Sequence, residues 1–149
     1  MRWIIPGDRD QLSDAIRRYR ENFDGHIDRS PPPSRGPRVC LALFAAADAL
    51  GLKFVRGVAP HLYLERLDSA VLEALGLIPA REGQRFDVFV RVPRFREAIF
   101  RAAVMRDGVP VSDVVQVWLD VADHPSRGPQ QAEEIWRQVL ARLWNNGAR

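Results

Sequence analysis

The sequence predicts an α+β fold: one domain over residues 1–149, in which a mixed sheet carries two C-terminal helices packed on it. A length of 149 residues suits a single domain. Hydrophobic residues make up 46% and charged residues 28%, as in globular proteins rather than disordered chains. Helical and strand-like patterns alternate without a strict βαβ rhythm, which favours the α+β class.

Apolar spacing sets the elements of the first fifty residues. Residues 2–5 form a short apolar run before a Pro-Gly pair, which is typical of a strand. Residues 24–37 contain four prolines and two glycines, so we expect an exposed loop there. An alanine-rich core helix is predicted over residues 37–50, ended by Gly51. Before that loop, a helix is predicted from apolar residues at spacings of four, three and four: Leu12, Ile16, Tyr19 and Phe23.

The middle of the chain predicts two strands and one short helix. The strands are expected at residues 52–56 and 61–65, joined by a turn at 57–60. A second turn is expected at Pro79. A short helix is predicted between the second strand and this turn, from apolar spacing and a glycine that ends the helix: Leu67, Val71, Leu75 and Gly76.

A strand and a hairpin follow. Residues 85–92 are the clearest strand, because apolar and other residues alternate over the whole run. The Asp-Gly pair at 107–108 predicts a hairpin between residues 100–105 and 109–111.

The C-terminal part, residues 112–144, is predicted to be helical. Residues 112–123 fit either a strand or a helix, and Ser112 as an N-cap favours the helix. The last helix is expected to begin with Gly128 as N-cap and Pro129 as its first residue. One face of that helix is apolar: Ala132, Ile135, Trp136, Val139, Leu140 and Leu143.

The composition excludes several classes of protein. Lys+Arg is 22 against 19 Asp+Glu, and all the bases except Lys53 are arginine. This small excess permits contact with nucleic acid without predicting it. A single cysteine, Cys40, excludes an internal disulfide framework and a multi-cysteine zinc site. We find neither a membrane span nor a signal peptide, and therefore expect a cytoplasmic domain without membrane contact.

Familiar catalytic motifs are missing from the sequence. It contains no GK[ST] P-loop and no G-x-S-x-G elbow. Asp120, Asp123 and His124 would share one helix face and could hold a metal, although solvated polar groups at a helix end are the simpler interpretation. Cys40 is expected to be a small buried thiol. We therefore predict that the chain is not an enzyme, and assign no catalytic residue, cofactor or metal.

A five-residue repeat, Pro-Ser-Arg-Gly-Pro, stands at residues 33–37 and 125–129, each copy just before a predicted helix. Glycine and proline at the start of a helix explain much of it. A helix N-terminus with serine and arginine nearby can also hold phosphate or a carboxylate. Anion binding through Arg35 or Arg127 is therefore the alternative interpretation.

The stretch of residues 111–140, VSDVVQVWLDVADHPSRGPQQAEEIWRQVL, combines several pairs of residues at fixed places. They are a serine before a valine-glutamine pair, a leucine-aspartate pair, a proline, an arginine-glycine pair and a helix start: Ser112, Val115-Gln116, Leu119-Asp120, Pro125, Arg127-Gly128 and Ala132-Glu133. This combination resembles a signature of the AbiEi-type antitoxin family of type IV toxin–antitoxin systems, whose members are transcriptional regulators. Looser similarity extends upstream, through the Asp-Gly hairpin to the alanine-rich helix.

The resemblance implies a non-enzymatic antitoxin domain that counteracts a nucleotidyltransferase toxin, in a protein that also regulates its own transcription. Family members carry an N-terminal winged helix-turn-helix that binds the promoter, followed by a C-terminal α+β antitoxin domain. This chain resembles only the second part, and we recognise no winged helix-turn-helix in it, so promoter contact would require a further N-terminal domain. The family is thought to act without a stable complex. The cognate toxin is therefore a functional partner, and physical contact with it stays open.

Two interpretations of the signature residues remain. Gln116 and Asp120 are four apart and would share a helix face, and Arg127 could fold back onto Asp120, so that the cluster locks the last two helices together. The alternative is a contact surface for the toxin or for the nucleic acid that it modifies. Its candidate residues are those of the signature: Ser112, Gln116, Asp120, Arg127, Gly128 and Glu133.

A second function is also open from the residues alone. The chain could be a nucleic-acid-binding module that uses arginines with interleaved aromatic residues: Arg91, Arg94, Arg96 and Arg101 with Phe89 and Phe95. That module would bind less tightly as salt rises, because binding releases counterions.

Overall fold

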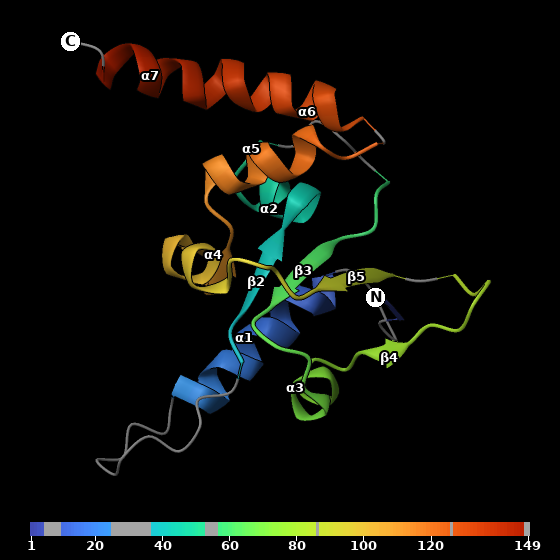
Figure 1. Ribbon diagram of the computed structural model, residues 1–149. Helices are drawn as coiled ribbons and strands as arrows, with labels where there is room; N and C mark the ends of the chain where they lie inside the picture. Colours follow the sequence, from blue (N-terminus) through green and yellow to red (C-terminus); the bar gives the residue numbers. More distant parts are fainter. Residues whose placement is uncertain (5–9, 25–36, 53–56, 86, 126, 148–149) are drawn as a thin grey trace.

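Seven strands form one mixed sheet in the order β4-β1-β5-β3-β2-β7-β6 (Figure 1). The computed structural model describes residues 1–4, 10–24, 37–52, 57–85, 87–125 and 127–147. The pair β3–β5 and the pair β2–β7 are parallel, and the other pairs are antiparallel. The strands are β1 (Arg2–Ile4), β2 (Val39–Ala42), β3 (His61–Leu64), β4 (Ile78–Pro79), β5 (Val88–Arg91), β6 (Val104–Arg106) and β7 (Val109–Val111).

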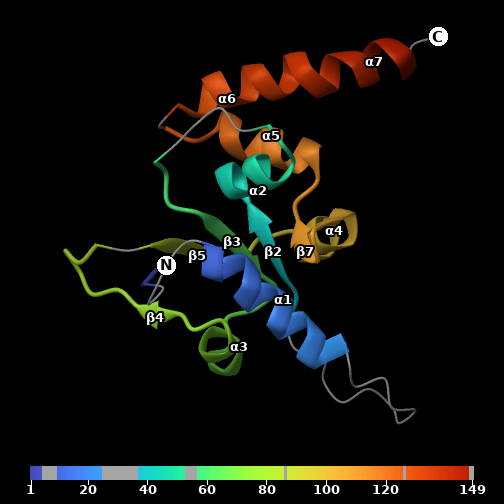
Figure 2. The same ribbon diagram turned by 180° about the vertical axis from the view of Figure 1, so that it is seen from behind.

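Helices pack on this sheet and beyond one end of it, so the predicted α+β class is confirmed. The helices are α1 (Asp10–Asp24), α2 (Leu43–Ala49), α3 (Ser69–Ala74), α4 (Arg96–Ala102), α5 (Val114–Ala122), α6 (Gly128–Ile135), the π-helix η1 (Trp136–Leu140) and α7 (Ala141–Gly147). Figures 1 and 2 show α1 against one face of the sheet, and α2 and α5 stacked past the end of β2. The segment α6–η1–α7 runs as one long helix across that stack.

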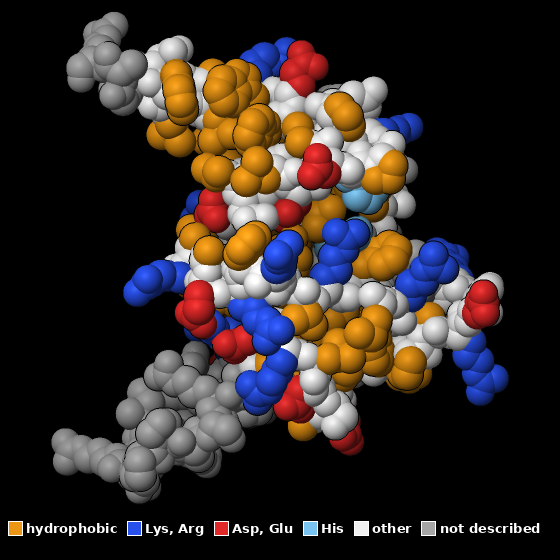
Figure 3. Space-filling model, in the orientation of Figure 1, with side chains coloured by type: hydrophobic (Ala, Val, Ile, Leu, Met, Phe, Trp, Pro, Cys, Tyr) orange, Lys and Arg blue, Asp and Glu red, His pale blue; other side chains and the backbone are white. Residues whose placement is uncertain are grey.

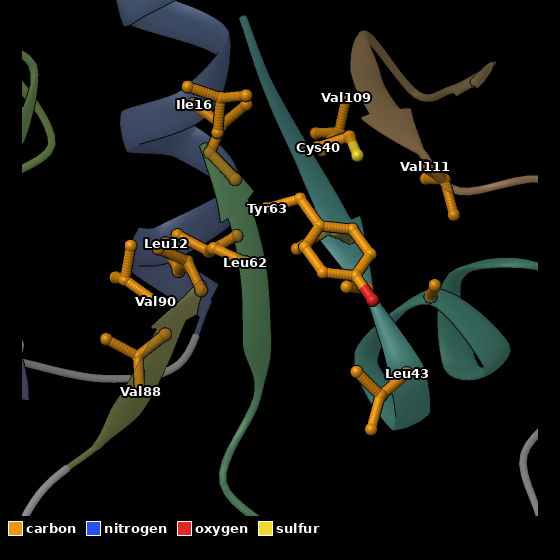
Figure 4. Close-up of a cluster of buried hydrophobic side chains, with 14 of the residues drawn as sticks. Leu12, Ile16, Cys40, Leu43, Leu62, Tyr63, Val88, Val90, Val109 and Val111 are labelled. Carbon is orange, nitrogen blue, oxygen red and sulfur yellow. The ribbon is translucent and has the colours of Figure 1, made fainter. Parts of the chain in front are cut away.

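The core lies between α1 and the sheet. Leu62 of β3 and Val90 of β5 are paired in register, and both are buried. Leu12 and Ile16 of α1 pack beside them (Figure 4), as their predicted stripe requires. Because side chains alternate along a strand, the neighbours of Leu62, including Tyr63, point to the other face of the sheet.

The prediction of one helix over residues 37–50 is wrong in its first half. Residues 39–42 form β2, which lies between β3 and β7 and is buried at all four positions. A strand covered on both faces lacks the polar alternation that marks a half-buried strand, so this run looks like the start of an apolar helix. The chain then passes directly into α2 at Leu43, whose φ of 48° is in the left-handed region. Gly51 follows α2 with a φ of 77°, as predicted for its end.

The other elements of the middle region largely match their predictions. Confirmed are the strands at the N-terminus and at residues 61–65, the short helix before Gly76, and the hairpin at Asp107-Gly108. Residues 100–102 belong to α4 instead of a strand, and Pro79 is paired in β4 instead of forming a turn. The strand predicted at 85–92 is shorter, Val88–Arg91. Residues 53–56 of the strand predicted at 52–56 and residues 25–36 of the loop predicted at 24–37 lie outside the described residues.

The helix chosen for residues 112–123 is confirmed, with a different cap. Asp113 is the N-cap of α5, and its Oδ1 accepts from the backbone N–H groups of Val115 and Gln116 at 2.9 and 3.2 Å. Ser112 is fully buried and faces the sheet. The last helix begins one residue earlier than predicted: Arg127, in the left-handed region at φ 55°, is its N-cap, and Gly128 is its first residue.

Candidate functional site

The signature residues divide into a set turned inward and a set exposed to solvent. Ser112 belongs to the inward set: its Oγ lies 3.6 Å from Sγ of Cys40 on β2, and its backbone N–H donates to the carbonyl of Leu41 at 3.0 Å. Burial raises the pKa of the Cys40 thiol to about 11, so the thiol stays protonated at neutral pH. Cys40 is therefore the buried thiol that the sequence predicts.

Asp120 is the centre of a polar cluster between α5 and the sheet. The amide of Gln116 donates to its Oδ1 at 2.8 Å, which confirms that the two side chains share a helix face. The hydroxyl of Tyr63 on β3 donates to its Oδ2, also at 2.8 Å. The predicted pair between Arg127 and Asp120 is not formed: the carboxylate oxygens accept from Gln116 and Tyr63, and Arg127 is exposed. The cluster therefore locks α5 to β3 instead of joining the last two helices.

Burial dominates the electrostatics of this cluster. It raises the pKa of Asp120, while the hydrogen bonds from Tyr63 and Gln116 and the charge of Arg91 act in the opposite direction. The pKa of Tyr63 is also raised, first by burial and then by the adjacent Asp120. The hydroxyl of Tyr63 is thus a firm donor, and the cluster has the character of a structural lock.

Tyr63→Phe tests this lock. The variant keeps the ring and removes the one hydroxyl that donates to Asp120, leaving a carboxylate oxygen without its partner. We expect a loss of about 1.5–3 kcal/mol in the free energy of unfolding, measured by urea denaturation. Asp120→Asn keeps an acceptor for Tyr63 and is expected to cost less. A Tyr63→Phe variant within 0.5 kcal/mol of the parent chain would contradict the lock.

His61 lies on the same face of the sheet and is 1% exposed. Its ring stacks on Phe89 at 4.7 Å and lies edge-on to His124, with centroids 6.0 Å apart. Neither ring nitrogen makes a hydrogen bond of normal geometry to a described residue. Burial, and after it the charges of Arg91 and His124, lowers the pKa of His61 to about 4. The imidazole is therefore neutral at physiological pH.

The hypothetical metal set of Asp120, Asp123 and His124 is not assembled. Asp120 turns to Tyr63, and Asp123 is exposed at the end of α5. His124 packs edge-on against Phe44, with ring centroids 4.9 Å apart. Within the described part of the chain, no three His, Cys, Asp or Glu side chains are grouped so that they could hold a metal ion.

The second copy of the Pro-Ser-Arg-Gly-Pro repeat has a steric role in the structure. A Cβ on Gly128 would lie 2.0 Å from the carbonyl oxygen of Val121 and 3.0 Å from Cβ of His124. The start of α6 is therefore pressed against the end of α5, at a distance that only glycine permits. Arg127 and Glu133 are exposed beside it. Ser126 and residues 33–36 of the first copy, including Arg35, lie outside the described residues.

Three of the predicted arginines lie where β5 passes into α4, and the fourth, Arg101, lies in the last turn of α4. Arg91, Arg94, Arg96 and Arg101 are all exposed. Phe95 is 71% exposed beside them, and the guanidinium carbon of Arg94 lies 5.7 Å from the centre of its ring. Phe89, the other aromatic residue predicted to take part, is half-buried under His61 and does not belong to this surface.

An exposed apolar surface lies on α5 and the C-terminal helix. We call it the aromatic surface; its exposed members are Val115, Leu119, Trp136, Leu143 and Trp144. Leu143 is 60% and Trp144 is 73% exposed, and half-buried Trp118 joins the two helices by a ring contact with Trp136 at 5.8 Å. Figure 3 shows hydrophobic side chains gathered over α7 and α5.

This surface was not predicted from the sequence, because Trp136 and Leu143 were placed on the same apolar face of the last helix as the residues that are buried. Ala132, Ile135 and Leu140 are buried as predicted, but Trp136 and Leu143 are exposed. The π-helix at residues 136–140 changes the periodicity in the middle of the stripe, so a constant 3.6-residue period places Leu143 on the wrong face. The available signal was Trp144, an aromatic residue outside the predicted stripe.

No protein family, curated protein or solved structure matches this chain. None of the helices among the described residues combines the length and the apolar character needed to cross a membrane.

Proposed function

We propose that the chain is the non-enzymatic antitoxin domain of a type IV toxin–antitoxin system, in a cytoplasmic protein that also regulates its own transcription. It would counteract a nucleotidyltransferase toxin by contact instead of by chemistry. The observation that carries this proposal is the aromatic surface. Three of its five exposed members, Val115, Leu119 and Trp136, lie inside the stretch that resembles the antitoxin family.

The chemistry of the surface supports binding to a protein. Soluble monomers seldom expose several large apolar residues side by side, and tryptophan is enriched where proteins bind one another. Two of the five exposed members are tryptophans. A surface of this kind also suits a short-lived complex, because transient interfaces are small. The proposal therefore includes a brief contact with the toxin and requires no stable complex.

The inward set of signature residues supports the proposal, because these residues fix the helices that carry the aromatic surface. Helices α5 and α6 are held in place on the side away from the aromatic surface by four residues of this set: Ser112, Gln116, Asp120 and Gly128. The exposed members on α5 and on the C-terminal helix then have a fixed relative position. A preorganised surface loses less conformational entropy when it binds.

Co-expression tests the proposal. The chain is produced together with a nucleotidyltransferase toxin of a type IV system, and growth is scored with and without the chain. We expect toxin-dependent growth arrest to be relieved when the chain is present. Continued arrest, with the chain shown to be folded in the same cells, would contradict the proposal.

A further inference from the structure

The junction between β5 and α4 carries a concentration of positive charge. Between residues 91 and 101 the sequence has four arginines and one glutamate, a formal charge of +3, which equals the net charge of the entire chain. Arg91 ends β5, Arg94 lies in the turn, and Arg96 begins α4. Figure 3 shows basic side chains across the middle of the molecule, apart from the hydrophobic group over α7 and α5.

The single acid of this segment is engaged elsewhere. Glu97 pairs with Arg38, whose guanidinium also binds Glu65 at 2.8 Å and lies 5.2 Å from the centre of the Phe100 ring. Among the described residues, no carboxylate lies within ion-pair distance of Arg91, Arg94, Arg96 or Arg101. The four guanidinium groups therefore keep their capacity to bind an anion.

Phe95 adds an aromatic face to this charge. It is 71% exposed at the N-cap of α4, so it contributes little to the core. The guanidinium of Arg94 lies 5.7 Å from its ring centre, in the range of a cation–π contact. An exposed ring among arginines is the combination with which proteins hold unpaired bases: the ring stacks on the base and the cations bind the phosphates.

We propose that this arginine–Phe95 surface, formed by Arg91, Arg94, Phe95, Arg96 and Arg101, binds single-stranded nucleic acid. A single strand is favoured over a duplex because only an unpaired base can offer its face to Phe95. Binding is not specific for sequence, since every base has a face that stacks. The inference is independent of the proposed antitoxin function, which rests on the aromatic surface on α5 and α7.

Fluorescence anisotropy of labelled oligonucleotides tests the inference with the full chain. The probes are an oligo-U RNA and an oligo-dT DNA of about 12 nucleotides, and a duplex of the same length; this is within the site sizes known for single-strand binders. We expect both single strands to bind more tightly than the duplex. The slope of log K against log salt should be about −2 to −3, as expected for three or four phosphates on single strands.

Variants separate stacking from general attraction. Phe95→Ala should weaken single-strand binding by roughly 5- to 150-fold, whereas Phe95→Trp should retain it. Arg94→Gln should also weaken binding and make the salt slope shallower by about 0.7. The matched controls are Trp144→Ala, an exposed aromatic residue on α7, and Arg81→Gln, an exposed arginine after β4; neither should change the affinity.

Four results would overturn the inference. The first is duplex binding as tight as single-strand binding. The second is an unchanged affinity in Phe95→Ala. The third is a loss in Arg81→Gln equal to that in Arg94→Gln, which would indicate attraction by overall charge only. Binding of anionic lipid vesicles without binding of either single strand would overturn it as well. None of these results bears on rescue from the toxin, so the two proposals can fail separately.

Discussion

Gly128→Ala is expected to destabilise the chain by about 3 kcal/mol or more, although alanine is the better helix former. Gly128 is the first residue of α6, and its Cβ would lie 2.0 Å from the carbonyl oxygen of Val121. That oxygen cannot easily move, because it accepts the backbone N–H groups of Asp123 and His124 at the end of α5. The added methyl group must therefore push α6 away from α5.

Thermal unfolding measures this effect, and a second glycine provides the control. We expect Gly128→Ala to lower the melting temperature by roughly 6–12 °C, given the usual 2–4 °C for each kcal/mol at this size. Gly51 has a positive φ of 77° but open space around its Cα. Gly51→Ala should therefore cost only the left-handed strain of about 1–2 kcal/mol. A Gly128→Ala variant as stable as the parent chain would show that α5 and α6 are not in close contact.

The second large effect is a loss of stability in acid that depends on His61. Its pKa is about 4 in the folded chain against 6.5 for an ordinary histidine. Below pH 6.5 the unfolded chain therefore binds a proton that the folded chain does not. Above pH 6.5 His61 is neutral in both states and does not lower the free energy of unfolding. As the pH falls from 6.5 to 4, protonation of His61 in the unfolded chain lowers the free energy of unfolding by about 3 kcal/mol.

His61→Phe isolates this contribution. Phenylalanine keeps a ring to stack on Phe89 and removes the two ring nitrogens, which are buried. Denaturation curves at pH 7 and pH 4 should show a smaller loss of stability in His61→Phe than in the parent chain, by about 3 kcal/mol. The carboxylates that titrate in this range are common to both proteins and cancel in the comparison. Equal losses in the two proteins would show that His61 is accessible to water and protons.

Sequence patterns correctly predicted the elements that are determined by residues close together in the sequence. The stripe of Leu12 and Ile16 identifies α1, and Asp107-Gly108 identifies the hairpin, in which both residues have the positive φ that this turn requires. The prediction for residues 39–42 failed because β2 is an internal strand, whose character depends on partners far away in the sequence.

The candidate site was predictable only within a single helix. The spacing of Gln116 and Asp120 placed them together correctly. Tyr63, the other partner of Asp120, lies 57 residues away, and no spacing rule reaches that far. The aromatic surface could not be predicted for a different reason. A π-helix at residues 136–140 interrupts the 3.6-residue period of the α-helix, and that period is what predicts which side chains are exposed.

Growth rescue by variants of the aromatic surface tests whether the chain counteracts the toxin through this surface. The double variant Leu119→Ser, Trp144→Ala changes two exposed side chains of this surface and leaves the Asp120 cluster intact. Phe95→Ala, an equally exposed aromatic residue on another face, is the matched control. We expect the parent chain and Phe95→Ala to relieve the growth arrest, while the folded double variant does not. Full rescue by the double variant would contradict the claim that the chain acts through this surface.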